Sequence, residues 1–148
     1  MSIKEQLMAD LQAAMRAKDV MRRDVIRMAR AAILNAEIDL QREASDPEVI
    51  QILTREVKRR QEAIELFALG KRDDLVQQEK AELAILQAYL PEQLSEGDIR
   101  EALQQIATEI NATSPAQLGA LMKQAMERLK GRADGRLVNQ IAREILNS

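Results

Sequence analysis

The chain has 148 residues, 46% of them hydrophobic and 31% charged, and a net charge of −2. The hydrophobic side chains are almost all Leu, Ile, Ala, Val and Met, with one Phe and one Tyr, which is typical of helical bundles. Cys, His and Trp are absent, which excludes disulfides, thiolate or imidazole metal sites, cysteine proteases and Ser-His-Asp triads.

No segment of the sequence predicts export or membrane insertion. There is no run of 18 apolar residues, and the N-terminal MSIKEQLMAD has charges where a signal peptide has its apolar region. We therefore expect a cytoplasmic protein that does not bind membranes.

The first two helices are predicted from their N-terminal caps. Ser2 and Glu5 form a capping-box pattern that opens a helix over 3–18. Asp19 can cap a second helix, which carries apolar residues at spacings of three and four and ends near Gln41.

A third and a fourth helix complete the predicted N-terminal bundle. Asp46 and Pro47 supply an N-cap and a first-turn proline for a helix over 47–69. Asp73 opens the fourth helix, and Pro91 ends it because a proline disfavours helical geometry in the residue before it.

Three shorter helices are predicted after the proline. A capping box beginning at Ser95 opens the fifth, and SPAQ at 114–117 opens the sixth. Gly131 suits the left-handed position after the sixth helix, and Asp134 can cap the seventh, over 135–146. We predict an all-α fold of about seven helices: a longer-helix N-terminal bundle over 1–90 and a compact three-helix domain over 95–148.

The C-terminal part is locally basic. Residues 119–143 carry six basic and two acidic side chains, a net charge of +4, so the rest of the chain carries −6. The basic residues gather around the turn LKGRADGRLVNQ, residues 129–140. Capping explains Gly131 and Asp134 there, but it does not explain the basic residues or Gly135.

This turn is the candidate nucleic-acid-binding site. A glycine at the first helical position lets another backbone approach, and the free N–H groups at a helix start attract anions. Basic side chains there would contact RNA phosphates, and Asn139 would reach a sugar hydroxyl or a base edge. The candidate residues are Lys123, Arg128, Lys130, Arg132, Gly135, Arg136 and Asn139. A solvated turn is the alternative, favoured by the cap carboxylate of Asp134, which neutralises part of the positive helix end.

Two further basic clusters are read mainly as structural. The third helix carries Arg55, Lys58, Arg59 and Arg60. Helical spacing pairs Arg60 with Glu56 and Arg59 with Glu62, so a salt-bridged outer face is the favoured interpretation. The second helix carries Arg22, Arg23, Arg27 and Arg30, which would extend an RNA track that Asp24 weakens.

The remaining polar and apolar features also receive structural interpretations. Asn35 and Glu37 are expected to form structural hydrogen bonds, and the seven methionines fall mostly on apolar stripes and are expected to fill the core. No glycine-rich phosphate loop is present. We expect no catalytic residues, no metal site and no cofactor.

Two long segments carry a family resemblance. KAELAILQAYLPEQLSEGDI followed by TSPAQLGALMKQAMERLKGRADGRLVNQIAREIL resembles the YqeY family, which is similar in turn to the C-terminal tail of GatB, the tRNA-docking subunit of the glutamine-dependent tRNA amidotransferase. The resemblance extends upstream through RRDVIRMARAAILNAEIDL and REVKRRQEAIELFALGKRDDLVQQEKAE. It implies contact with tRNA. The family label of carbon–nitrogen ligase activity with glutamine as amido-N-donor implies at most a component of that enzyme, since the chain has no counterpart of its catalytic domain.

The resemblance and the basic turn together predict a non-catalytic tRNA-binding module that acts beside an amidotransferase or another tRNA enzyme. With so few aromatic residues, recognition would rest on phosphates and would fall steeply with salt. The alternative is a helical protein–protein adaptor without RNA binding, which would expose an apolar groove between the second and third helices. A third hypothesis, an amidotransferase component that takes part in catalysis, requires a glutaminase partner.

Overall fold

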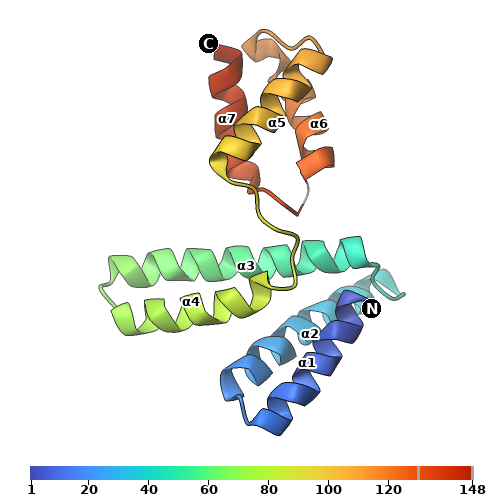
Figure 1. Ribbon diagram of the computed structural model, residues 1–148, viewed down its shortest axis with the longest axis vertical. Helices are drawn as coiled ribbons and strands as arrows, with labels where there is room; N and C mark the ends of the chain where they lie inside the picture. Colours follow the sequence, from blue (N-terminus) through green and yellow to red (C-terminus); the bar gives the residue numbers. More distant parts are fainter. Residues whose placement is uncertain (130, 148) are drawn as a thin grey trace. The chain divides into compact units, whose positions relative to one another are not determined.

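The computed structural model describes residues 1–129 and 131–147, and all regular elements in these ranges are helices (Figure 1). They are α1 (Ile3–Ala17), α2 (Val20–Leu40), α3 (Asp46–Leu69), α4 (Asp73–Gln87), α5 (Glu96–Glu109), the 3-10 turn η1 (Pro115–Gln117), α6 (Leu118–Leu129) and α7 (Gly135–Asn147). The predicted all-α fold with seven helices is confirmed. The chain divides into two compact units, Met1–Leu90 and Pro91–Ser148.

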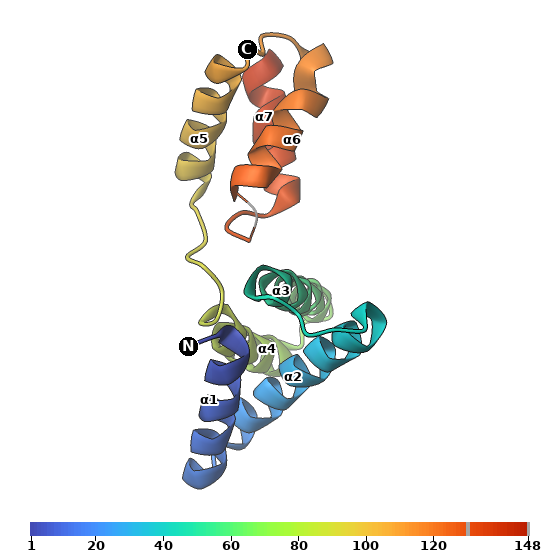
Figure 2. The ribbon, with the colours of Figure 1, turned by 90° about the vertical axis from the view of Figure 1, so that its right-hand side faces the viewer.

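The N-terminal unit consists of two helical hairpins, α1–α2 and α3–α4 (Figures 1 and 2). Leu7 of α1, Ile26 of α2 and Leu53 of α3 have no exposed surface and belong to one apolar cluster. Local caps begin the first hairpin as predicted. The Ser2 hydroxyl accepts a hydrogen bond from the Glu5 N–H at 3.1 Å, and the Asp19 carboxylate accepts one from the Arg22 N–H at 3.1 Å.

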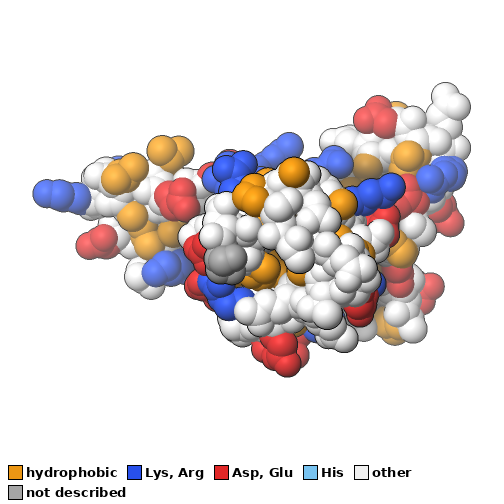
Figure 3. Space-filling view, turned by 90° about the horizontal axis from the view of Figure 1, so that it is seen from above, with side chains coloured by type: hydrophobic (Ala, Val, Ile, Leu, Met, Phe, Trp, Pro, Cys, Tyr) orange, Lys and Arg blue, Asp and Glu red, His pale blue; other side chains and the backbone are white. Residues whose placement is uncertain are grey.

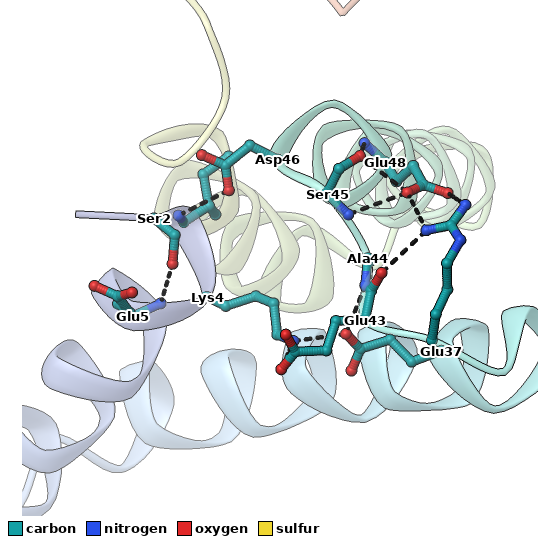
Figure 4. Close-up of polar contacts among 11 residues, drawn as sticks. Ser2, Lys4, Glu5, Glu37, Glu43, Ala44, Ser45, Asp46 and Glu48 are labelled. Atoms are coloured by element: carbon teal, nitrogen blue, oxygen red, sulfur yellow. Dashed lines mark hydrogen bonds and ion pairs between the residues drawn. The ribbon is translucent and has the colours of Figure 1, made fainter.

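The start of α3 differs from the prediction, because Ser45 and not Asp46 is the N-cap (Figure 4). The Ser45 hydroxyl accepts from the Glu48 N–H at 3.4 Å, and Glu48 accepts in return from the Ser45 N–H at 3.1 Å. Asp46 lies in the helix and accepts a hydrogen bond from the N–H of Ile3 at 3.2 Å. The Asp46 carboxylate, which the sequence predicted to cap α3, therefore accepts its hydrogen bond from the start of α1.

The end of α4 also differs from the prediction, since the helix stops at Gln87 and does not continue to Pro91. The N–H groups of Tyr89 and Leu90 donate to carbonyls three residues back, each at 3.1 Å, so the chain leaves the helix through a tighter turn. At the start of this helix the N-cap is Arg72, without a side-chain capping bond, and not Asp73.

Arg60 points inward and is 9% exposed, which contradicts the predicted outer face of the basic run on α3. Its guanidinium Nη1 donates to Glu82 at 2.6 Å and lies 3.3 Å from Glu79, and both carboxylates belong to α4. The predicted pair of Arg60 with Glu56 does not form. Glu56 instead accepts from Arg59 at 3.3 Å, so the predicted pair of Arg59 with Glu62 is also wrong.

In the C-terminal unit, α5, α6 and α7 surround a second core, in which Leu103, Leu121 and Ile141 are fully buried. The capping box over 114–117 forms as predicted, but it opens a 3-10 turn that leads into α6. Gly131 has a φ of 78°, the left-handed conformation predicted after α6.

The large exposed hydrophobic side chains all lie in the N-terminal unit. Five of the seven methionines are among them, between 37% and 86% exposed, so the prediction that methionines fill the core holds only for Met122 and Met126. Figure 3 shows hydrophobic side chains at the surface beside Lys and Arg side chains. Within the ranges that the structure describes, no helix has the length and apolar character needed to cross a bilayer.

Candidate nucleic-acid interface

The turn between α6 and α7 is built by backbone bonds and by a short segment that packs on it. The Arg132 N–H donates to the Leu129 carbonyl at 2.9 Å, which closes the turn around Gly131. The carbonyls of Gly131 and Arg132 accept from the Gln93 side chain and the Leu94 N–H, each at 2.8 Å. These two carbonyls are therefore satisfied within the same unit.

Asp134 caps α7 as predicted. Its carboxylate accepts from the Arg136 N–H at 3.3 Å, and its carbonyl accepts from the Val138 N–H at 3.0 Å. The carboxylate partly neutralises the positive end of the helix. The free N–H groups of this helix start therefore offer less positive charge than those of an uncapped helix.

Arg132 and Arg136 are exposed at this turn. Neither forms an ion pair with any residue in the described ranges. Asn139 lies one turn further along α7 and is half-buried. The predicted site residue Lys130 lies outside the residues that the structure describes.

Gly135 is not required by a close contact within the chain. A Cβ atom added there would lie 3.8 Å from the terminal methyl of Met126, an ordinary van der Waals distance. An alanine would fit at this position, so the packing of this unit does not demand the glycine.

The other two predicted residues, Lys123 and Arg128, lie on α6, before the turn. Arg128 donates to Glu109 at the end of α5 at 2.6 Å, and this hydrogen bond holds the pKa of Glu109 below its ordinary value. Both side chains are more than 40% exposed, so solvent screens the pair. Lys123 is exposed and lies about 9 Å along the helix axis before the end of α6.

Sequence reasoning missed Arg143, which is exposed and has no ion pair with the described residues. It follows Arg136 by seven residues, which places the two side chains on one face of α7. This seven-residue spacing is the feature of the sequence from which Arg143 could have been predicted as a site residue. Glu144 does not neutralise this face, because it accepts from Arg100 of α5 at 2.6 Å.

On α2, two of the four arginines are held by neighbours. Arg22 lies 3.4 Å from Asp19, and Arg23 lies 2.9 Å from Asp24. Arg27 and Arg30 form no ion pair with the part of the chain that the structure describes.

Glu37 has the structural role that was expected of it (Figure 4). Its carboxylate accepts from the Lys4 ammonium at 2.6 Å and from the Ala44 N–H at 2.7 Å, which joins α1 to the α2–α3 loop. The bond from Lys4 is the main cause that lowers the pKa of Glu37. Asn35 is exposed and lines a polar pocket between α2 and α3 together with Asp39 and Arg55.

No group of three or more acidic side chains in the described ranges is arranged to hold a metal ion. At the α6–α7 turn and along α7, the described residues present three exposed arginines without ion pairs, Arg132, Arg136 and Arg143.

Comparison with known proteins gives a family match over residues 4–146, to the model described as YqeY, Yqey-like protein. Several curated relatives share the name "Altered inheritance of mitochondria protein 41, mitochondrial". The protein from Pyrenophora tritici-repentis is 32% identical over 145 residues, which cover 96% of this chain and 80% of the relative. The protein from Lachancea thermotolerans is 34% identical over 113 residues, or 74% of this chain and 60% of the relative. The protein from Eremothecium gossypii is 40% identical over 85 residues, or 57% of this chain and 46% of the relative. The matched part thus spans about half of the length of the last two relatives.

These names correct the predicted cytoplasmic location. The relatives are named as mitochondrial proteins, which points to mitochondria and not to the cytoplasm. The absence of an export signal, on which the prediction rested, does not distinguish these two compartments. The match over nearly all of the sequence shows that this chain belongs to the YqeY family.

Proposed function

We propose that this chain is a non-catalytic RNA-binding module that takes tRNA as its ligand and acts beside an amidotransferase or another tRNA enzyme. The observation that carries the proposal is the row of Arg132, Arg136 and Arg143 at the α6–α7 turn and along α7. All three side chains are exposed and none is held by an ion pair among the described residues. Unpaired arginines suit phosphate contacts, because the planar guanidinium can donate two hydrogen bonds to one phosphate.

The charge distribution supports binding of tRNA by the C-terminal unit and not by the whole surface. The net charge of −2 gives no general attraction to nucleic acid, whereas residues 119–143 carry +4. Recognition would depend mainly on the shape and the phosphates of the RNA. The chain has only one Phe and one Tyr on which bases could stack, and both lie in the N-terminal unit.

The test is a mobility-shift titration of the purified chain with unfractionated tRNA at low salt. Arg132→Glu combined with Arg136→Glu should weaken binding by about tenfold or more, because two phosphate contacts become repulsive. The matched control is Arg55→Glu combined with Lys58→Glu, which makes the same change in net charge on α3 at exposed positions. The control should bind within about threefold of the unaltered chain.

Three results would contradict the proposal. Absence of any tRNA-dependent shift at low salt contradicts the function itself. An equal loss of binding in both double variants contradicts the site, because it assigns the attraction to net charge alone. Release of ammonia from glutamine by the chain alone would contradict the non-catalytic role, and a protein partner retained through nuclease treatment, without any shift, would favour the adaptor alternative.

A further inference from the structure

The outer side of the α1–α2 hairpin contains a groove whose lining comes from these two helices and from Lys18 and Asp19, which connect them. Its main hollow has a volume of about 490 Å³. A second hollow of about 300 Å³ lies toward the connection between the helices, and the two hollows share Arg27. Because α1 has 15 residues, the hairpin is about 22 Å long, the length of a partner helix of about four turns.

Exposed apolar side chains from both helices line the groove. Met8 and Met15 lie seven residues apart on α1 and are 40% and 50% exposed. Leu34 of α2 is 59% exposed and faces the same hollow as Met8. Methionine side chains adapt to irregular partners, and surfaces rich in them bind amphipathic helices.

The charges along the groove are unbalanced toward positive. Lys4 and Glu37 form an ion pair with each other at 2.6 Å. Three basic lining residues form no ion pair with the described residues: Lys18, Arg27 and Arg30. Among the acidic lining residues, only Glu5 likewise forms no ion pair with them. A partner that covers the apolar strip would also desolvate these cations, so it must bring carboxylates of its own.

We propose that this α1–α2 groove binds an amphipathic helix of a partner protein, with an apolar stripe flanked by Asp and Glu. The apolar stripe fills the hollow beside Met8 and Leu34. The acidic flanks pair with Arg27 and Arg30. This contact lies in the N-terminal unit, whereas the proposed tRNA site uses residues of the C-terminal unit, so each can fail without the other.

The test measures binding of synthetic helical peptides to the whole chain by fluorescence anisotropy. Two peptides of about 16 residues share one leucine stripe, and one is flanked by Glu and the other by Lys. The Glu-flanked peptide should bind at least about tenfold more tightly at low salt. Arg27→Glu combined with Arg30→Glu should reverse this preference.

Leu34→Asp should weaken binding of the Glu-flanked peptide by about tenfold or more, because it places a carboxylate in the apolar strip. The matched control is Leu66→Asp on α3, at a leucine that is 68% exposed and lies outside the groove, and it should leave binding unchanged. Met8→Glu provides a second groove variant if Leu34→Asp does not keep the circular dichroism of the unaltered chain.

Four outcomes would overturn the proposal. Equal binding of both peptides removes the charge argument, and an equal loss with Leu66→Asp removes the site. A dimer seen by light scattering and dissociated by Leu34→Asp would assign the groove to a second copy of the chain. Displacement of the peptide by tRNA would assign it to nucleic acid.

Discussion

The buried ion cluster around Arg60 gives the most specific prediction about stability. Arg60 reaches from α3 to Glu79 and Glu82 of α4, whose side chains are 22% and 18% exposed. Its Nη2 also lies 3.7 Å from the sulfur of Met28 on α2, so the side chain touches three helices. Arg60→Met keeps much of the stem and removes the charge.

The expected cost of Arg60→Met is about 2 kcal/mol in the free energy of unfolding. Removal of one partner from a fully buried pair typically costs about 3–5 kcal/mol, because a charge is left without compensation. Here both carboxylates keep about a fifth of their surface in water, which relieves part of that penalty. Glu82→Gln in the Arg60→Met background should recover about 1 kcal/mol of the free energy of unfolding, because it removes one of the two carboxylates that Arg60 no longer neutralises.

Urea unfolding followed by tyrosine fluorescence measures this effect. The one tyrosine, Tyr89, packs against the core of the N-terminal unit, so its signal reports on the unit that contains Arg60. A double-mutant cycle of Arg60→Met and Glu82→Gln should give a coupling free energy of about 1–2 kcal/mol. A coupling near zero would refute the reasoning, because the two side chains would then contribute independently.

Three further predictions concern single positions. Gly131→Ala should destabilise the C-terminal unit by about 1 kcal/mol in thermal unfolding followed by circular dichroism, because its φ of 78° is strained for any residue with a Cβ. A hydrogen bond from Arg42 and bonds from Ser45 lower the pKa of Glu48 from 4.5 to about 2, so its stabilising effect is present above pH 4.5 and is lost toward pH 2. The stability difference between the unaltered chain and Glu48→Gln in urea should therefore shrink over that interval, and a constant difference would count against the capping bonds. Burial raises the pKa of Tyr89 above 10.0, so absorbance at 295 nm should show its ionisation at higher pH in the folded chain than in urea.

Local sequence signals predicted the helices because their determinants lie within a few residues of each helix end. Ser2, Asp19 and Gly131 act through bonds or dihedral angles of their immediate neighbours, and all three have their predicted positions. Ser45 and Asp46 are adjacent residues that can both cap a helix. The choice between them depends on the contact of Asp46 with Ile3, which is 43 residues away.

Other features depended on tertiary packing that periodicity does not contain. Helical spacing paired Arg60 with Glu56, but its acidic partners lie 19 and 22 residues further along the chain. Met8 and Met15 have the spacing of a core stripe, yet the hairpin leaves their face of α1 open. In the candidate site, Arg132 and Arg136 are four residues apart, so the sequence alone placed both at the same turn. The pairing of Arg128 with Glu109, by contrast, needed the packing of α5 against α6.

The salt dependence of tRNA binding tests the central claim most directly. The logarithm of the association constant should fall linearly with the logarithm of salt concentration, and each lost phosphate contact should reduce the slope by about 0.7–0.9. We expect Arg132→Ala and Arg136→Ala each to reduce the slope by about one contact. Arg72→Ala, which removes an arginine already paired with Asp74 in the N-terminal unit, should leave the slope unchanged. Identical slopes in all of these variants, or no binding at low salt, would contradict a phosphate-binding site at the start of α7.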